Sequence, residues 1–131
     1  MIRTRFFEPT DEAAREGWIG PGWQVTDLIR EVLGRASGRG HPAAEIVRED
    51  GSSVSLGTDG EWAVLVWVDS LGNSHHSVGD GGRSNLVYDY FGSWSEAPSD
   101  CQVPLEDAVV AMDQFAQRGT PVTEHVIFQP D

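Results

Sequence analysis

The chain has 131 residues, of which 9 are basic and 21 acidic, so its formal net charge is -12 and its isoelectric point is near 4.5. A single domain spanning residues 1–131 is the expectation at this length. Phosphate binding requires clustered positive charge, so the composition argues against nucleic acid and against an anionic membrane surface as partners. Cys101 is the only cysteine, which excludes an internal disulfide and a four-thiolate zinc site and fits a cytoplasmic location.

The first part of the chain is rich in glycine and proline and predicts little regular structure. Residues 1–24 are expected to form an irregular N-terminal lead-in. Thr26 has the side chain of an N-cap, and the apolar residues after it recur at helical spacing. A first helix is therefore predicted over Thr26–Leu33, and Gly34 is a typical stop for it.

A block of β-forming segments follows, separated by turn signals such as Asp50-Gly51. Trp62–Val68 has β-forming residues on both faces and predicts a central strand that is covered on both sides. Its apolar run is far shorter than the about 20 residues that a membrane-spanning helix requires. The strands predicted for this meander are residues 44–48, 53–57, 62–68, 74–78 and 86–91.

The clearest helical pattern lies near the C-terminus. Pro104 suits the first position of a helix, and apolar residues recur at helical spacing up to Arg118, before Gly119 ends the pattern. A loop is predicted over residues 92–102 before this helix, and a strand over residues 122–128 after it. The order of elements predicts an α+β fold, in which an antiparallel sheet, a meander of about five to six strands, carries two main helices packed on one face.

His75 and His76 are the first candidates for catalysis or metal binding. Neighbouring residues of a strand point to opposite faces, so the two cannot bind one ion together, and no further residue has ligand spacing. We therefore predict no metal site, no cofactor and no catalytic residue. One alternative stays open, a small hydrolase that uses His75 or His76 with a carboxylate.

Acidic and aromatic residues lie together around the turns and the last strand of the predicted meander. Aromatic side chains supply contact area and a negative field steers encounter, so this combination suits a basic protein partner. The same residues could instead occupy solvated turns and core positions. The residues predicted to bind a partner are Asp69, Asp80, Asp89, Tyr90, Trp94, Glu96 and Asp100.

Several segments between residues 44 and 128 follow a distinctive order: a central strand, an acidic and aromatic loop, a helix that starts at Val-Pro and a terminal strand. These segments are Leu65–Asp69, Tyr88–Pro98, Val103–Ala108, Phe115–Pro121 and Val126–Phe128. In this order they resemble the Imm1 family of bacterial immunity proteins. The chain departs from the family at Phe128, where members often carry tryptophan, and around Pro121, where an Arg-Pro pair is common.

The resemblance implies a protein that is encoded beside a toxin gene of a polymorphic or contact-dependent competition system. Such proteins bind the toxin domain tightly in the cytoplasm of the producing cell. Several relatives are paired with nucleic-acid deaminase toxins, although the family also accompanies other toxins, and any zinc would belong to the toxin. The charge agrees, because a highly acidic protein can plug the basic substrate channel of such a toxin. A regulatory module that binds another host protein stays open as a further alternative.

Overall fold

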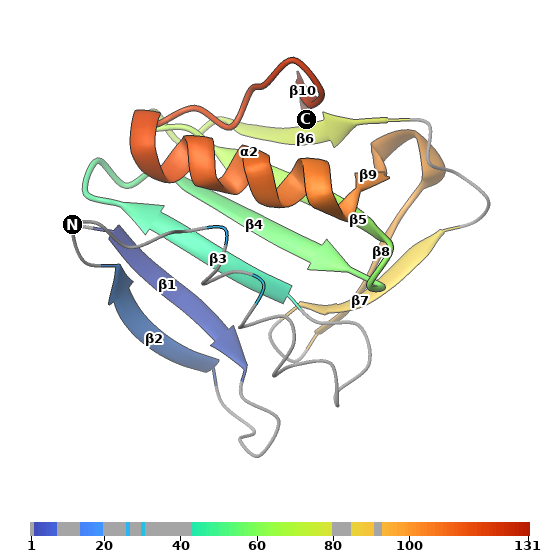
Figure 1. The fold of residues 1–131 in the computed structure, drawn as a ribbon, viewed down its shortest axis with the longest axis horizontal. Coiled ribbons are helices and arrows are strands. Elements are labelled where there is room, and N and C mark those ends of the chain that lie inside the picture. Colours follow the sequence, from blue (N-terminus) through green and yellow to red (C-terminus); the bar gives the residue numbers. More distant parts are fainter. Residues whose placement is uncertain are drawn as a thin grey trace.

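The computed structural model describes residues 2–7, 14–19, 26, 30, 43–79, 85–90 and 93–131, and of residues 2–7, 14–19, 88–90, 93 and 94 it describes the backbone. Within these ranges the fold consists of a large antiparallel sheet, one long helix lying across it and a separate two-stranded hairpin (Figure 1). The α+β fold class predicted from the sequence is confirmed.

The main sheet has eight strands, of which β9 pairs with β5 and the others follow the order β10-β6-β5-β4-β3-β1-β2. Every pairing in it is antiparallel, and β3, β4 and β5 lie in its middle (Figure 1). Its strands are β1 (Ile2–Phe7), β2 (Ala14–Ile19), β3 (Ala43–Arg48), β4 (Ser53–Thr58), β5 (Trp62–Val68), β6 (Ser74–Val78), β9 (Val103–Pro104) and β10 (Ile127–Pro130).

The N-terminal lead-in departs from the prediction, because its described parts form the β1–β2 hairpin instead of irregular chain. β1 also pairs with β3, with Thr4 opposite Ile46 and Arg5 opposite Glu45. This second partner of β1, β3, lies far along the chain, so the local pattern of residues gives no sign of the pairing. This pairing adds two strands to the edge of the predicted meander.

A second correction concerns β7 (Leu86–Tyr90), which was predicted as the last strand of the meander. β7 pairs with β8 (Ser93–Ala97) in a separate sheet, and β8 falls in the stretch predicted as the loop 92–102. Ser93 and Ser95 are small polar residues with a weak strand signal, which explains why the sequence pattern missed β8. A short 3-10 helix, η2 (Ser99–Cys101), leads on to β9.

The hairpin packs on the face of the main sheet opposite the helix. Leu86 and Ala97 are buried in one cluster with Ala43 and Val64 of the main sheet. The next residue of β3, Ala44, belongs to the other cluster, under the helix. Successive residues of a strand point to opposite faces, so the two clusters lie on opposite sides of the sheet.

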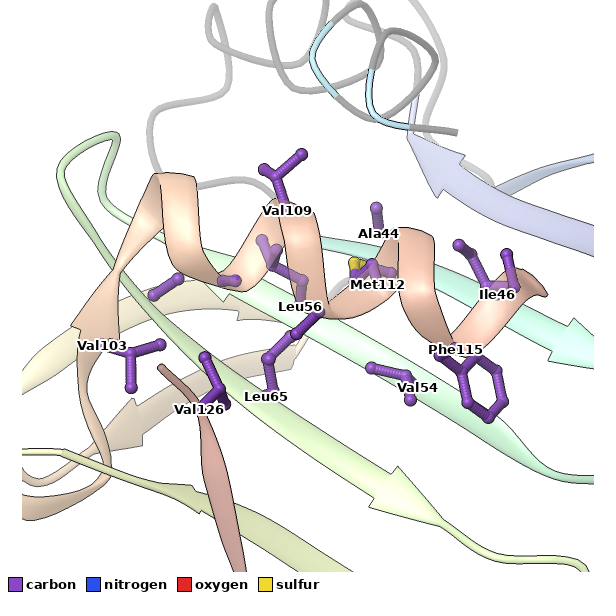
Figure 2. Close-up of a cluster of buried hydrophobic side chains, with 14 residues drawn as sticks. Ala44, Ile46, Val54, Leu56, Leu65, Val103, Val109, Met112, Phe115 and Val126 are labelled. Carbon is purple, nitrogen blue, oxygen red and sulfur yellow. The ribbon is translucent and has the colours of Figure 1, made fainter. Parts of the chain in front are cut away.

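Helix α2 (Leu105–Arg118) forms one side of the main core, and the sheet forms most of the other side. Its buried side chains follow the spacing of a single helical face and meet the sheet along its length (Figure 2). Burial of these side chains is the main source of stability for this layer. The core residues are Ala44, Ile46, Val54, Leu56, Ala63, Leu65, Val103, Ala108, Val109, Ala111, Met112, Phe115, Ala116 and Val126.

The predicted C-terminal helix is confirmed almost to the residue. Pro104 directly precedes it, and Gly119 ends it with a φ of 83° and an N–H that donates to the carbonyl of Phe115 at 2.8 Å. Within the described residues one helix packs on the sheet, where the sequence predicted two. Of the predicted first helix only Thr26 and Arg30 are described, and both are helical.

The closing strand begins later than predicted. Residues 122–126 are not a strand; there Thr123 donates its N–H to the carbonyl of Val126 at 3.0 Å in a turn, and β10 starts at Ile127. β10 then pairs with β6 at the edge of the main sheet. Pro130 lacks an N–H group, so it limits the hydrogen bonding that this edge strand can offer to another strand.

The side chain of Ser77, on β6, bonds to β5 and to η2 where β5 changes partner. β5 pairs with β6 from Val66 to Val68 but with β9 at Trp62 and Ala63. Ser77 is fully buried at this junction, accepts the N–H of Leu65 at 3.0 Å and donates to the carbonyl of Cys101 at 2.7 Å. Its hydroxyl thus replaces the backbone pairing that the separation of β5 and β6 removes.

Candidate partner-binding surface

The outward face of the β7–β8 hairpin is the first part of the candidate surface. Asp89 lies opposite Trp94 in the ladder and Val87 lies opposite Glu96, so these four positions share one face. Position 90 belongs to the other face, together with the buried Leu86 and Ala97. The register therefore brings Asp89, Trp94 and Glu96 together and separates Tyr90 from them.

Glu96 and Asp100 carry the described acidic side chains of this region, and both are exposed. Asn85 donates from its side-chain amide to Glu96 Oε2 at 3.4 Å across the hairpin. Asp100 lies in η2, which directly follows β8. Two of the predicted acids are thus close along one connected segment, whereas Asp80 lies outside the described residues.

Asp69 has a structural task of its own at the β5–β6 turn. Its Oδ1 accepts the N–H groups of Leu71 at 3.0 Å and Asn73 at 2.9 Å, and its Oδ2 lies 3.2 Å from His75 Nε2. The backbone N–H of Asn73 and then His75 hold the pKa of Asp69 below its ordinary value. η2 contacts the other end of β6 through Gly79, so Asp69 lies away from Glu96 and Asp100.

The two neighbouring histidines have separate carboxylate partners. His75 stacks on Trp67 with ring centres 4.7 Å apart and meets Asp69. His76, whose position lies on the opposite face of β6, contacts Asp131 through Nδ1. Hydrogen bonds from Ser74 at 2.5 Å and from His76 lower the pKa of Asp131. Each histidine thus has its own carboxylate, on its own face of β6.

Among the described side chains, few are cationic. The arginines whose side chains are described are Arg30, Arg48 and Arg118. Arg30 forms an ion pair of 2.8 Å with Glu106, and Arg48 donates to carbonyl groups at the end of α2. Two of the three described arginines are thus engaged elsewhere, and the chain as a whole carries a net charge of -12.

Two absences can be stated for the described residues only. Among them, no three histidine, cysteine, aspartate or glutamate side chains lie close enough together to hold a metal ion. None of the helices in the described ranges is long and apolar enough to cross a membrane.

Cys101 is a free thiol. Its partial burial, and then the charge of Asp100, raise its pKa, so it is a weak nucleophile.

Sequence reasoning missed the residues that hold this surface in place. Gln102 is 3 % exposed and donates from its side-chain amide to the carbonyl of Ala97 at 3.1 Å. Gly79 donates its N–H to the carbonyl of Asp100 at 2.8 Å. Gln102 is the last residue of the predicted loop 92–102 and Gly79 directly follows the predicted strand 74–78, and no local pattern distinguishes such contacts from solvated ones.

Comparison with known proteins gives one match. The family model described as "Immunity protein Imm1" matches residues 19–126, which is most of the chain. No curated protein matches the chain. The family match extends over β3 to α2 and so includes the hairpin, η2 and both histidines.

Proposed function

Because the chain belongs to the Imm1 family of immunity proteins, we propose that it binds a cognate bacterial toxin domain and neutralises it by covering the active site. The partner is a basic domain that acts on nucleic acid, such as a deaminase, since a channel for nucleic acid is lined by positive charge. The net charge of -12 on this chain suits such a partner. The protein acts by binding, in the cytoplasm of the producing cell, and performs no chemistry itself.

The observation that supports this proposal most directly is the register of the β7–β8 hairpin. It gives Asp89, Trp94 and Glu96 one common face, turned away from the main sheet, and Asp100 follows in the adjoining η2. We call these four residues the acidic surface. An aromatic anchor among carboxylates is the composition that binds a basic, partly apolar partner. Asp80 and Tyr90 stay predictions as additional contacts.

We propose a smaller role for Asp69 in toxin binding. Its carboxylate already accepts two backbone N–H groups and meets His75, so a partner would compete with the turn for it. A carboxylate that is used internally contributes mainly through its charge. We therefore propose that Asp69 adds to the negative field that steers the toxin and makes no direct contact.

Co-expression with the toxin domain encoded beside this gene tests the proposal. Cells that produce the toxin domain alone are expected to stop growing, and cells that also produce this chain are expected to survive. The two purified proteins should then elute together in gel filtration. Continued growth arrest together with separate elution of the two proteins would contradict the proposal.

A matched pair of charge reversals tests the acidic surface itself. Glu96→Arg reverses a charge on the hairpin, whereas Glu124→Arg reverses an exposed charge in the turn before β10. Both changes alter the net charge equally, so only a local role of Glu96 separates them. We expect Glu96→Arg to weaken protection and Glu124→Arg to leave it intact; equal protection by both variants would remove Glu96 from the surface.

A further inference from the structure

Residues 97–102 connect the hairpin to the main sheet and carry part of the acidic surface. Glu96 directly precedes this segment, and Asp100 lies within it, on η2. The segment begins at Ala97, which is 4 % exposed, and ends at Gln102, which is 3 % exposed. Both of its ends are thus buried, while the acidic side chains beside and between them are exposed.

Two hydrogen bonds tie the middle of this segment to β6 and the residue after it. Gly79 donates its N–H to the carbonyl of Asp100 at 2.8 Å, and Ser77 donates its hydroxyl to the carbonyl of Cys101 at 2.7 Å. The approach is so close that a Cβ atom on Gly79 would lie 1.9 Å from the carbonyl oxygen of Gln102. Only glycine therefore allows this contact between the two backbones.

The side chain of Gln102 closes the segment on itself. Its amide Nε2 donates to the carbonyl of Ala97 at 3.1 Å, which joins the end of the segment to the end of β8. The bond is buried, so water cannot replace it when it is lost, and the carbonyl of Ala97 would lose this donor. The end of β8, and with it the backbone of Glu96, is therefore fixed relative to η2.

We propose that Gln102 is a positioning residue for toxin binding, which holds Glu96 and Asp100 in the arrangement that the toxin recognises. This inference rests on the proposed function. A surface that is rigid before binding loses less conformational entropy when the complex forms, and the gain appears mainly as slower dissociation. Gln102 acts through the segment and not by touching the toxin, because its side chain is buried.

The test compares two glutamines that each donate a side-chain amide to a backbone carbonyl, Gln102 in a buried position and Gln114 in a partly buried one. Gln102→Met keeps the length of the side chain and removes the donor. Gln114→Met is the control, because Gln114 also donates its amide to backbone carbonyls, those of Thr120 at 3.4 Å and of Val122, beyond the opposite end of α2. The measurements are thermal unfolding of each variant and dissociation of each variant from the toxin domain encoded beside the gene.

Gln102→Met is expected to raise the dissociation rate constant roughly tenfold, and amide exchange in β8 should accelerate. Gln114→Met should leave the dissociation rate constant and amide exchange in β8 unchanged, even where the two variants lose similar thermal stability. Should Gln102→Met fail to fold, Ser77→Ala, which removes the bond to the carbonyl of Cys101, is expected to raise dissociation in the same way. Unchanged dissociation of a folded variant would overturn the inference, whereas a wild-type chain that does not bind the toxin would overturn the proposed function instead.

Discussion

The guanidinium group of Arg48, on β3, donates a hydrogen bond of 3.0 Å to the carbonyl of Phe115 near the end of α2, and it lies 5.9 Å from the centre of the Phe115 ring. A second bond of 2.5 Å reaches the carbonyl of Ala116. The last carbonyls of a helix have no partner within it, and their partial negative charge attracts a cation. An arginine of the sheet thus caps the helix and attaches its C-terminal end to the core.

Arg48→Ala is expected to lower the free energy of unfolding by about 1–3 kcal/mol, because the carbonyl of Ala116 loses its arginine donor, the carbonyl of Phe115 keeps only the N–H of Gly119, and a cation leaves the helix end. Arg118→Ala is the control, since Arg118 is an exposed arginine in the last turn of the same helix. Arg118→Ala should lower the free energy of unfolding by less than about 1 kcal/mol. Urea denaturation measures both values; equal losses would show that the contact of Arg48 with the helix carries no special weight.

Ser77→Ala tests the contacts of β6 with β5 and η2. The substitution leaves the N–H of Leu65 and the carbonyl of Cys101 without the hydroxyl in a fully buried position, so stability should fall by about 1–3 kcal/mol. Ser70→Ala, in the exposed β5–β6 turn, should change stability by less than about 0.5 kcal/mol. Thermal or urea unfolding of the pair gives the comparison, and a Ser77 variant as stable as the Ser70 variant would refute the role of the hydroxyl.

The lowered pKa of Asp69 predicts a specific loss of stability in acid. A carboxyl group whose folded pKa is depressed stabilises the fold above its unfolded pKa, which for aspartate is about 4, and this contribution disappears as the pH falls through the folded pKa. In Asp69→Asn that contribution is absent at every pH. The urea midpoint of the wild type should therefore fall more steeply than that of Asp69→Asn between about pH 4 and pH 2. Parallel curves would mean that the carboxylate of Asp69 does not stabilise the turn.

The salt dependence of association tests electrostatic steering by the hairpin. Glu96→Arg is expected to slow association with the toxin domain by roughly 3- to 10-fold at low salt, because an attractive charge becomes repulsive. The difference should shrink at high salt, where exposed charges are screened. Stopped-flow measurement at several salt concentrations gives the association rate constant and its salt dependence. Glu124→Arg is the control variant of equal net charge. A rate for Glu96→Arg that equals the rate of this control at every salt concentration would argue against steering by the hairpin.

The parts of the fold that the sequence predicted are those with strong local signals. Helix α2 has a proline before it, a regular apolar face and a glycine after it, and β3 to β6 have alternating or continuous β-forming residues between clear turns. The β1–β2 hairpin, β8 and the departure of β7 from the meander depend on which segments pair in space. Pairing of this kind is set by the whole fold and leaves no periodicity in either strand.

The candidate surface was predictable to a smaller extent. The sequence identified the acids and aromatics, but only the ladder shows that Asp89, Trp94 and Glu96 share a face while Tyr90 does not. Asp69 did carry a readable signal, because aspartate three residues before glycine is typical of a type I turn, and Gly72 has a φ of 85°. Gln102 gave no signal, since its burial and its bond to the carbonyl of Ala97 depend on the folded structure.

Titration of the purified chain into the purified toxin domain, with the catalytic activity of the toxin on its nucleic-acid substrate as the readout, tests the central claim most directly. The account predicts that activity falls to zero at one equivalent of the chain and that excess substrate delays this inhibition, because both occupy the same site. Full toxin activity in a large excess of the folded chain would contradict it.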